Sequence, residues 1–174
     1  MRFVLGTTGD YRGRLRRLMG LFVGNRAIRG DPMFGIPTGA ELAGVALCTP
    51  PEPAAPSPEL AEFQARAWAE LGLDAWERYQ ACVAAWGEVG VADPNVHLNI
   101  LSIPPRYQGH GLARPLLDQV HLLSREYARS TGVSLTTEDP KNVRLYEYFG
   151  YRVVGRREVV PGLETWGFFR PDSA

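Results

Sequence analysis

The sequence has no excess charge, few cysteines and no long apolar run. Its 174 residues contain 19 Lys and Arg against 19 Asp and Glu, so the formal net charge is zero. A neutral chain has no overall field that would draw it to nucleic acid or to an anionic membrane, and we expect neither partner. No apolar run approaches the length of a membrane span, and the start of the chain lacks the apolar stretch of a signal peptide. We therefore expect a cytoplasmic protein.

The two cysteines, Cys48 and Cys82, show no spacing typical of a metal site or a redox motif. We expect them to be buried free thiols in a reducing compartment, and we expect no metal ion. The length fits a single domain that spans residues 1–174. A hydrophobic content of 45% and a charged content of 22% are ordinary for a globular domain.

The most informative stretch is residues 97–114, where an apolar run, a double proline, a glycine turn and a helical pattern follow one another. The apolar run ends at Pro104, and Gly109 and Gly111 follow before the helical pattern begins. The order predicts a strand, a turn and a helix N-terminus. The first N–H groups of a helix lack intrahelical partners and attract anions, and glycine lets a ligand approach the backbone. The stretch therefore indicates a phosphate or pyrophosphate site, with a tight turn that binds no ligand as the alternative.

Two signatures in this part of the chain resemble those of the GNAT superfamily of acyl-CoA N-acyltransferases. Gln108-x-x-Gly111-x-Ala113 resembles the Gln/Arg-x-x-Gly-x-Gly/Ala loop that holds the pyrophosphate of coenzyme A. About 30 residues later, the stretch from Asn142 to Tyr151 is similar to the second signature, an Asn-x-x-x-Tyr helix that ends at Gly-Phe/Tyr. Both signatures stand in the order and at the distance typical of the superfamily.

Within the superfamily, the chain is most similar to puromycin N-acetyltransferase and its bacterial relatives. The likeness extends from about Glu41 to Arg170 and departs at Thr136, where those relatives tend to carry Glu. The resemblance implies an α/β GNAT fold, with a mixed, mostly antiparallel sheet of about six to seven strands, helices on both faces, and a helical insert before the central strand. The usual first strand is short or absent here.

Hydrophobic periodicity places the individual elements along the chain. It predicts helices over residues 14–22, 58–71, 75–87, 112–130 and 140–149, and we expect Gly132 to stop the fourth of them. It predicts strands over residues 33–36, 41–48, 97–103, 133–137, 151–155 and 163–169, with a short strand at 3–5 less clear than the others.

The resemblance also implies which residues hold coenzyme A. Main-chain groups of the central strand would hold the pantetheine, the glycine loop would hold the pyrophosphate, and an asparagine would contact the coenzyme near its pantetheine arm. In that order, these residues are Leu101, Ser102 and Ile103, then Gln108, Gly109, His110, Gly111, Leu112, Ala113 and Arg114, and finally Asn142.

Two side chains are candidates for the catalytic acid and base. Tyr146 matches the general acid of the superfamily, a phenol that protonates or hydrogen-bonds the departing sulfur; a helix tyrosine packed against the sheet is the alternative. His97 occupies the position at which histone-type members place a catalytic Glu, and histidine titrates near neutral pH. By the period of two in a strand, His97 shares a face with Asn99 and Leu101. A packed ring remains the alternative for His97, and we expect His121 to be structural.

Two groups of residues between the signatures and the N-terminus admit two interpretations each. An apolar stripe at helical spacing favours packing against the sheet over a ligand pocket. Arginines near the N-terminus favour a solvated helix face over a phosphate patch for nucleic acid. The stripe comprises Trp68, Leu71, Trp76, Tyr79, Val83 and Trp86, and the arginines are Arg12, Arg14, Arg16 and Arg17.

These observations predict an N-acetyltransferase that moves an acetyl group from acetyl-CoA, its co-substrate, to a primary amine of a small molecule. The transfer would occur directly in a ternary complex, without a covalent enzyme intermediate. An acyl-CoA-binding regulatory or sensor module with little turnover is the alternative, suggested by the short N-terminal strand and by Thr136 in place of Glu. Binding of a phosphate ligand or nucleic acid through the arginine helix is a third hypothesis, and a homodimer is left open.

Overall fold

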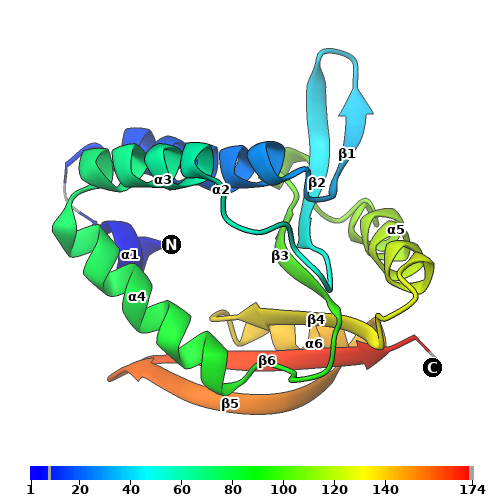
Figure 1. Ribbon diagram of the computed structural model, residues 1–174. Coiled ribbons are helices and arrows are strands. Elements are labelled where there is room, and N and C mark those ends of the chain that lie inside the picture. The colour runs from blue at the N-terminus through cyan, green and yellow to red at the C-terminus, as the bar shows by residue number, and fades with distance from the viewer. Residues whose placement is uncertain (8, 173–174) are drawn as a thin grey trace.

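The computed structural model describes residues 1–7 and 9–172, which form one six-stranded sheet with helices on both of its faces (Figure 1). The strand order is β1-β2-β3-β4-β6-β5. Only the β3–β4 pair is parallel, so the sheet is mixed and mostly antiparallel, as predicted. The strands are β1 (Met33–Thr38), β2 (Glu41–Thr49), β3 (Val96–Ser102), β4 (Gly132–Thr137), β5 (Arg152–Val160) and β6 (Leu163–Pro171).

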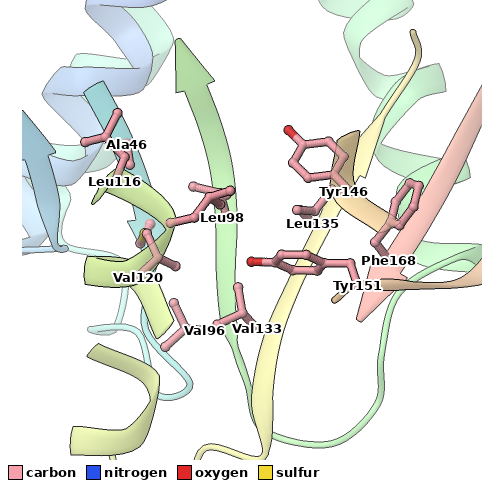
Figure 2. Packing of buried hydrophobic residues seen from close by; sticks show 12 residues of the cluster. Ala46, Val96, Leu98, Leu116, Val120, Val133, Leu135, Tyr146, Tyr151 and Phe168 are labelled. Carbon is pink, nitrogen blue, oxygen red and sulfur yellow. The ribbon is translucent and has the colours of Figure 1, made fainter. Parts of the chain in front are cut away.

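The helices divide between the two faces, and each face has its own buried cluster. One cluster contains side chains of α5 and α6 together with residues of β2, β3, β4 and β6 (Figure 2). The other contains side chains of α1 to α4. The helices are α1 (Arg2–Leu5), α2 (Tyr11–Arg29), α3 (Pro58–Leu71), α4 (Leu73–Glu88), α5 (Ala113–Glu126) and α6 (Lys141–Tyr148), with one 3-10 turn at Pro105–Tyr107. Among the described residues, no helix has the length and apolar character needed to cross a membrane.

The prediction of a short strand at residues 3–5 is wrong, because these residues belong to helix α1. Val4 and Leu5 are buried in the cluster of α1 to α4. Their carbonyl groups accept hydrogen bonds from side chains, Val4 from Arg78 at 2.9 Å and Leu5 from Arg14 at 2.5 Å. The segment thus fills a gap between helices, and the sheet edge begins with β1. The expectation that the usual first strand is short or absent is confirmed.

The prediction that helix 112–130 ends at Gly132 is also wrong. Helix α5 ends at Glu126, Tyr127 is extended, and Gly132 is the first residue of β4. A Cβ atom on Gly132 would lie 2.3 Å from the carbonyl oxygen of Arg170 on β6. Glycine is therefore required here by the close approach of two strands, and a single sequence does not distinguish that requirement from a helix stop.

The hairpin and the helical insert lie where the sequence predicts them. Strands β1 and β2 pair as a hairpin, and α3 and α4 occupy the segment between the proline-rich stretch and β3. Helix α3 begins at Pro58 after Ser57, whose hydroxyl accepts the N–H of Leu60 at 3.1 Å. Proline at the first helical position and serine as the N-cap fix this boundary.

Candidate functional site

Strands β3 and β4 pair only over their first halves. Residues 96–98 of β3 pair with residues 133–135 of β4. Beyond this point β3 remains paired with β2 and β4 remains paired with β6, so the two strands diverge from each other (Figure 1). The divergence leaves the main-chain groups on the facing edges of Asn99–Ser102 and Thr136–Thr137 without strand partners. It opens the sheet at its centre, and a cavity lies on each side of the opening.

A β-bulge at Asn99 changes which side chains of β3 face each cavity. Leu47 of β2 lies opposite Ile100, but the next residue of β2 lies opposite Leu98, so Asn99 is an extra residue in β3. His97, Asn99 and Ile100 all line the cavity on the α1–α4 side, whereas Leu101 lines the cavity on the opposite side. The expectation that Leu101 shares a face with His97 is therefore wrong, because the bulge breaks the alternation after Asn99.

The cavity on the α5–α6 side, which we call the loop cavity, contains most of the residues predicted to hold coenzyme A. Its volume is about 530 Å³. Ser102 and His110 do not line it: Ser102 is exposed at the end of β3, and His110 is exposed with its Nδ1 atom 3.0 Å from the carbonyl oxygen of Gln108. The predicted residues that do line it are Leu101, Ile103, Gln108, Gly109, Gly111, Leu112, Ala113, Arg114, Asn142 and Tyr146.

The glycine loop presents main-chain N–H groups that have no protein acceptor. Gly109 and Gly111 have φ angles of 80° and 75°, a conformation that only glycine adopts readily, and open space surrounds both. No hydrogen bond among the described residues uses the N–H groups of residues 109–113 as donors, and no side chain caps the start of α5. The side-chain amide of Gln108 donates to the carbonyl oxygen of Ile103 at 2.9 Å and supports the loop. Consecutive free N–H groups at a helix N-terminus form an anion-binding site.

Tyr146 lies at the boundary between the loop cavity and the core. Its ring packs 5.5 Å from that of Phe168 and 5.8 Å from that of Tyr151, between centroids (Figure 2). Burial and the charge of Glu138 raise the pKa of Tyr146 to about 12, so its hydroxyl keeps its proton at neutral pH. The hydroxyl makes no hydrogen bond to any described residue. The amide of Asn142, which lines the same cavity, donates to the hydroxyl of Thr137 at 3.1 Å.

His97 lies in the cavity on the α1–α4 side, which we call the central cavity and which has a volume of about 300 Å³. The Ser134 hydroxyl is 2.8 Å from Nδ1 of His97 and donates its own proton to Oδ1 of Asn95. Because Asn95 donates through Nδ2 to the carbonyl oxygen of Asp93, its Oδ1 atom is an acceptor. Ser134 must then accept from His97, which places the imidazole proton on Nδ1 and leaves Nε2 as an acceptor without a hydrogen-bond partner among the described residues.

Burial, together with the charge of Arg26, lowers the pKa of His97 to about 4. The imidazole is therefore neutral at physiological pH, and it is a weak base. Arg26 is itself buried on α2 and donates to the carbonyl oxygens of Phe22 at 2.8 Å and Cys48 at 3.2 Å. His121 lies outside both cavities, with Nε2 placed 2.9 Å from the Tyr151 hydroxyl, which confirms its structural role.

Glu138 was not predicted and is one of two carboxylates that line the central cavity; the other, Asp31, forms an ion pair with Arg29 at 3.3 Å. Glu138 lies one residue beyond β4, on the same face as Thr136 by the period of two. Its Oε1 atom accepts from Nε1 of Trp86 at 2.7 Å and from the hydroxyl of Thr165 at 3.1 Å. The chain thus has a carboxylate near the position where the puromycin-type relatives carry Glu, displaced by two residues. The alternation along β4 was the signal in the sequence that would have found it.

The two cysteines are buried and free, as predicted. Burial raises the pKa of Cys48 to about 12 and that of Cys82 to about 11. Both are therefore protonated at neutral pH and unsuited to nucleophilic attack. The described residues contain no group of three or more His, Cys, Asp and Glu side chains arranged to hold a metal ion.

Residues 63–167, more than half of the chain, match the family model described as acetyltransferase (GNAT) domain. The chain belongs to the GNAT acetyltransferase family. It is therefore an acyl-CoA-dependent N-acetyltransferase, and members of this family use acetyl-CoA. A search of curated proteins found no match. The similarity to the puromycin-type branch stays a prediction.

Solved structures of other acetyltransferases share the GNAT fold. A polyamine N-acetyltransferase of Drosophila melanogaster, which forms N-acetylagmatine, is 16% identical, with a TM-score of 0.59, and the match covers 96% of this chain and 85% of that one. A structure from Corynebacterium glutamicum, named histone acetyltransferase HPA2 and related acetyltransferase, is 18% identical, with a TM-score of 0.59. The match covers 95% of this chain and 78% of that one. The ribosomal-protein-S18-alanine N-acetyltransferase of Escherichia coli is 16% identical, with a TM-score of 0.52 and coverage of 89% and 77%.

Proposed function

We propose that this enzyme transfers an acetyl group from acetyl-CoA to the primary amine of a small molecule, in one ternary complex. The observation that carries the proposal is the run of free N–H groups over residues 109–113 beside a cavity that Tyr146 also lines. The pyrophosphate of the coenzyme would accept hydrogen bonds from this run, with the guanidinium group of Arg114 nearby. The pantetheine would lie along the free edge of β3 over residues 101–103, so that the thioester reaches the opening between β3 and β4.

The amine would enter from the central cavity on the other side of this opening. We assign to Glu138 the binding of the ammonium form, because opposite charges attract strongly where water is scarce. Its carboxylate then takes the proton, directly or through a water molecule. Nε2 of His97 would accept a hydrogen bond from the amine and orient its lone pair. The low pKa of His97 supports this positioning role over that of the principal base.

The transfer itself requires one bond to form and one to break. The neutral amine nitrogen attacks the thioester carbonyl carbon, the carbon–sulfur bond breaks, and the nitrogen loses its second proton to solvent, because Glu138 already holds the first. The sulfur leaves as a thiolate that receives a hydrogen bond from the protonated hydroxyl of Tyr146. The high pKa values of Cys48 and Cys82 support direct transfer over an acetylated-cysteine intermediate.

Calorimetric titration with acetyl-CoA tests the proposal. We expect micromolar binding, on the order of 8 kcal/mol. In Gly111→Leu this binding should be lost, since a side chain is strained at a φ of 75° and would also cover the N–H groups. Gly162→Leu is the matched control, because Gly162 has a φ of 83° in the β5–β6 turn and does not line the loop cavity. Thiol release across a panel of primary amines then measures turnover.

Absence of binding to the unaltered chain would overturn the proposal. Tight binding without thiol release for any amine would favour the sensor module instead. Equal binding to the Gly111→Leu variant would show that the coenzyme lies elsewhere.

A further inference from the structure

A large apolar cavity lies among the helices on the acceptor side of the sheet. We call it the aromatic cavity; its volume is about 780 Å³, within the range of small-molecule sites. Helices α2, α3 and α4 surround it, and Figure 1 shows α2 and α3 side by side with α4 descending from the end of α3. Its walls include the aromatic side chains Phe22, Trp68, Trp76 and Tyr79 and the small side chains Ala61 and Ala65.

The space exists because α3 carries small residues opposite the large ones of α4. Ala61 and Ala65 are one helical turn apart and share a face of α3. The aromatic rings pack against one another instead of filling this space: Trp68 lies 5.0 Å from Trp76 and 4.8 Å from Tyr79, between ring centroids. A rigid, preformed aromatic wall is thus available to a ligand.

The aromatic cavity adjoins the central cavity. Four residues line both: Phe22, Asn25, Gln64 and Tyr79. Aromatic contacts also lead from the aromatic cavity to Glu138. Tyr79 packs 5.7 Å from Trp86, between ring centroids, and Trp86 donates a hydrogen bond to the Glu138 carboxylate. A molecule whose amine lies beside Glu138 would therefore place its other end against Trp68 and Trp76.

The aromatic cavity offers no carboxylate that could pair with a second ammonium group at that end. None of the described residues that line it is Asp, Glu, Lys or Arg. The polar side chains that line it are uncharged, namely Asn25, Gln64, Gln80 and Tyr79 with the indoles of Trp68 and Trp76. The Oδ1 atom of Asn25 is buried without a hydrogen-bond partner among the described residues. The central cavity, in contrast, is lined by the charged side chains Arg26, Arg29, Asp31 and Glu138. A polycation would thus find no carboxylate partner for its second charge there.

We infer that the acceptor is a primary amine attached to an apolar, preferably aromatic, body, and that the aromatic cavity binds this body. The inference rests on the proposed function and adds the substrate class. In this inference the helical insert selects the acceptor, and the transfer takes place at the opening between β3 and β4.

Three amines with the same reacting group test this inference. They are 2-phenylethylamine, ethylamine, which lacks only the phenyl ring, and 1,4-diaminobutane, which carries a second charge. Burial of one ring predicts a kcat/KM for 2-phenylethylamine about 10- to 100-fold above that for ethylamine, with the diamine no better than ethylamine. Calorimetric titration of 2-phenylethylamine into the protein saturated with coenzyme A provides a binding measurement that needs no turnover.

A cavity-filling variant tests whether the preference for 2-phenylethylamine arises in the aromatic cavity. Ala65→Trp places an indole in the aromatic cavity at an exposed position of α3, without removing a core side chain. It should lower the ratio of the two kcat/KM values toward one and weaken the binding of 2-phenylethylamine. Ala92→Trp is the matched control, because Ala92 is exposed in the loop before β3 and lines neither cavity. Both variants should unfold at the temperature of the unaltered chain.

The outcomes separate this inference from the proposed function. Binding of 2-phenylethylamine that Ala65→Trp abolishes, without acetylation, would support the cavity and overturn the transferase proposal. Acetylation of ethylamine or the diamine at least as well as 2-phenylethylamine would overturn the inference and leave the proposed function intact. A homodimer that Ala65→Trp dissociates, with the amine preference unaltered, would show that a second copy of the chain covers the aromatic cavity and would also overturn the inference.

Discussion

The two faces of the sheet build their cavities in different ways. The loop cavity comes mainly from two short stretches, residues 101–114 and 142–149, each of which carries a recognisable pattern. The central and aromatic cavities are assembled from α2, α3, α4, β3 and β4, none of which carries a motif. A coenzyme that is bound through main-chain hydrogen bonds requires only a local backbone conformation. An acceptor is instead recognised by side chains that tertiary packing brings together. We therefore expect a single sequence to indicate a coenzyme site more readily than an acceptor site.

The largest effect that we expect from a single change concerns Tyr146. In Tyr146→Phe the ring remains packed against Phe168, but the hydroxyl that we propose as hydrogen-bond donor to the leaving sulfur is lost. We expect kcat to fall about 10³-fold, while calorimetry shows acetyl-CoA binding close to that of the unaltered chain. Tyr127→Phe is the control, because Tyr127 packs against the same cluster outside both cavities. A kcat for Tyr146→Phe equal to that of the control would show that Tyr146 only packs against the sheet and does not act as the catalytic acid.

The sequence predicts most of this face because its determinants are local. Gly109 and Gly111 have positive φ angles, and Asn142 and Tyr146 lie one helical turn apart facing the loop cavity. Turn geometry and helical spacing act over a few residues, so their patterns are visible without a structure. Six strands and the helical insert are likewise as predicted.

The face that we propose for the acceptor was harder to predict because its determinants are long-range. The bulge at Asn99 depends on pairing with β2, which lies about 50 residues earlier in the chain. The contact between Trp86 and Glu138 joins α4 to the end of β4, and nothing in either segment indicates it. Helix α1 forms because Val4 and Leu5 fill a gap between helices, a requirement that exists only after α2 and α4 have packed.

The buried clusters on the two faces can be compared by matched truncations. Leu117 of α5 and Leu18 of α2 are both fully buried, one in each cluster. We expect Leu117→Ala and Leu18→Ala each to lower the free energy of unfolding by about 3 kcal/mol. Both should shift a single urea transition, because β3 contributes Leu98 to one cluster and Ile100 to the other. Two separate transitions in Leu18→Ala would mean that α1 to α4 unfold independently of the sheet.

A smaller effect is expected on the acceptor side at Glu138. Glu138→Gln keeps an oxygen that can accept from Trp86 and Thr165 but removes the negative charge. We expect kcat/KM for the amine to fall about tenfold, which is 1.4 kcal/mol, with unchanged affinity for acetyl-CoA. Glu164→Gln, a nearby acid on β6 whose partner is Arg156, should retain full activity. A loss of affinity for acetyl-CoA in Glu138→Gln would contradict this assignment, because it would show that Glu138 contributes to binding of the coenzyme.

The smallest effect compares one histidine from each face. Burial lowers the pKa of His97 and of His121 from 6.5 to about 4, so between these pH values the unfolded chain binds protons that the folded chain does not. Stability should therefore fall as the pH decreases from 6.5 toward 4, by about 1 kcal/mol per histidine at pH 5.5. Urea titrations at pH 7.5 and 5.5 measure the difference. His97→Gln and His121→Gln should each reduce that difference by a similar amount, whatever their stability at pH 7.5. An undiminished difference in His97→Gln would mean that this imidazole already binds a proton in the folded enzyme, as a catalytic base with a pKa near neutral would.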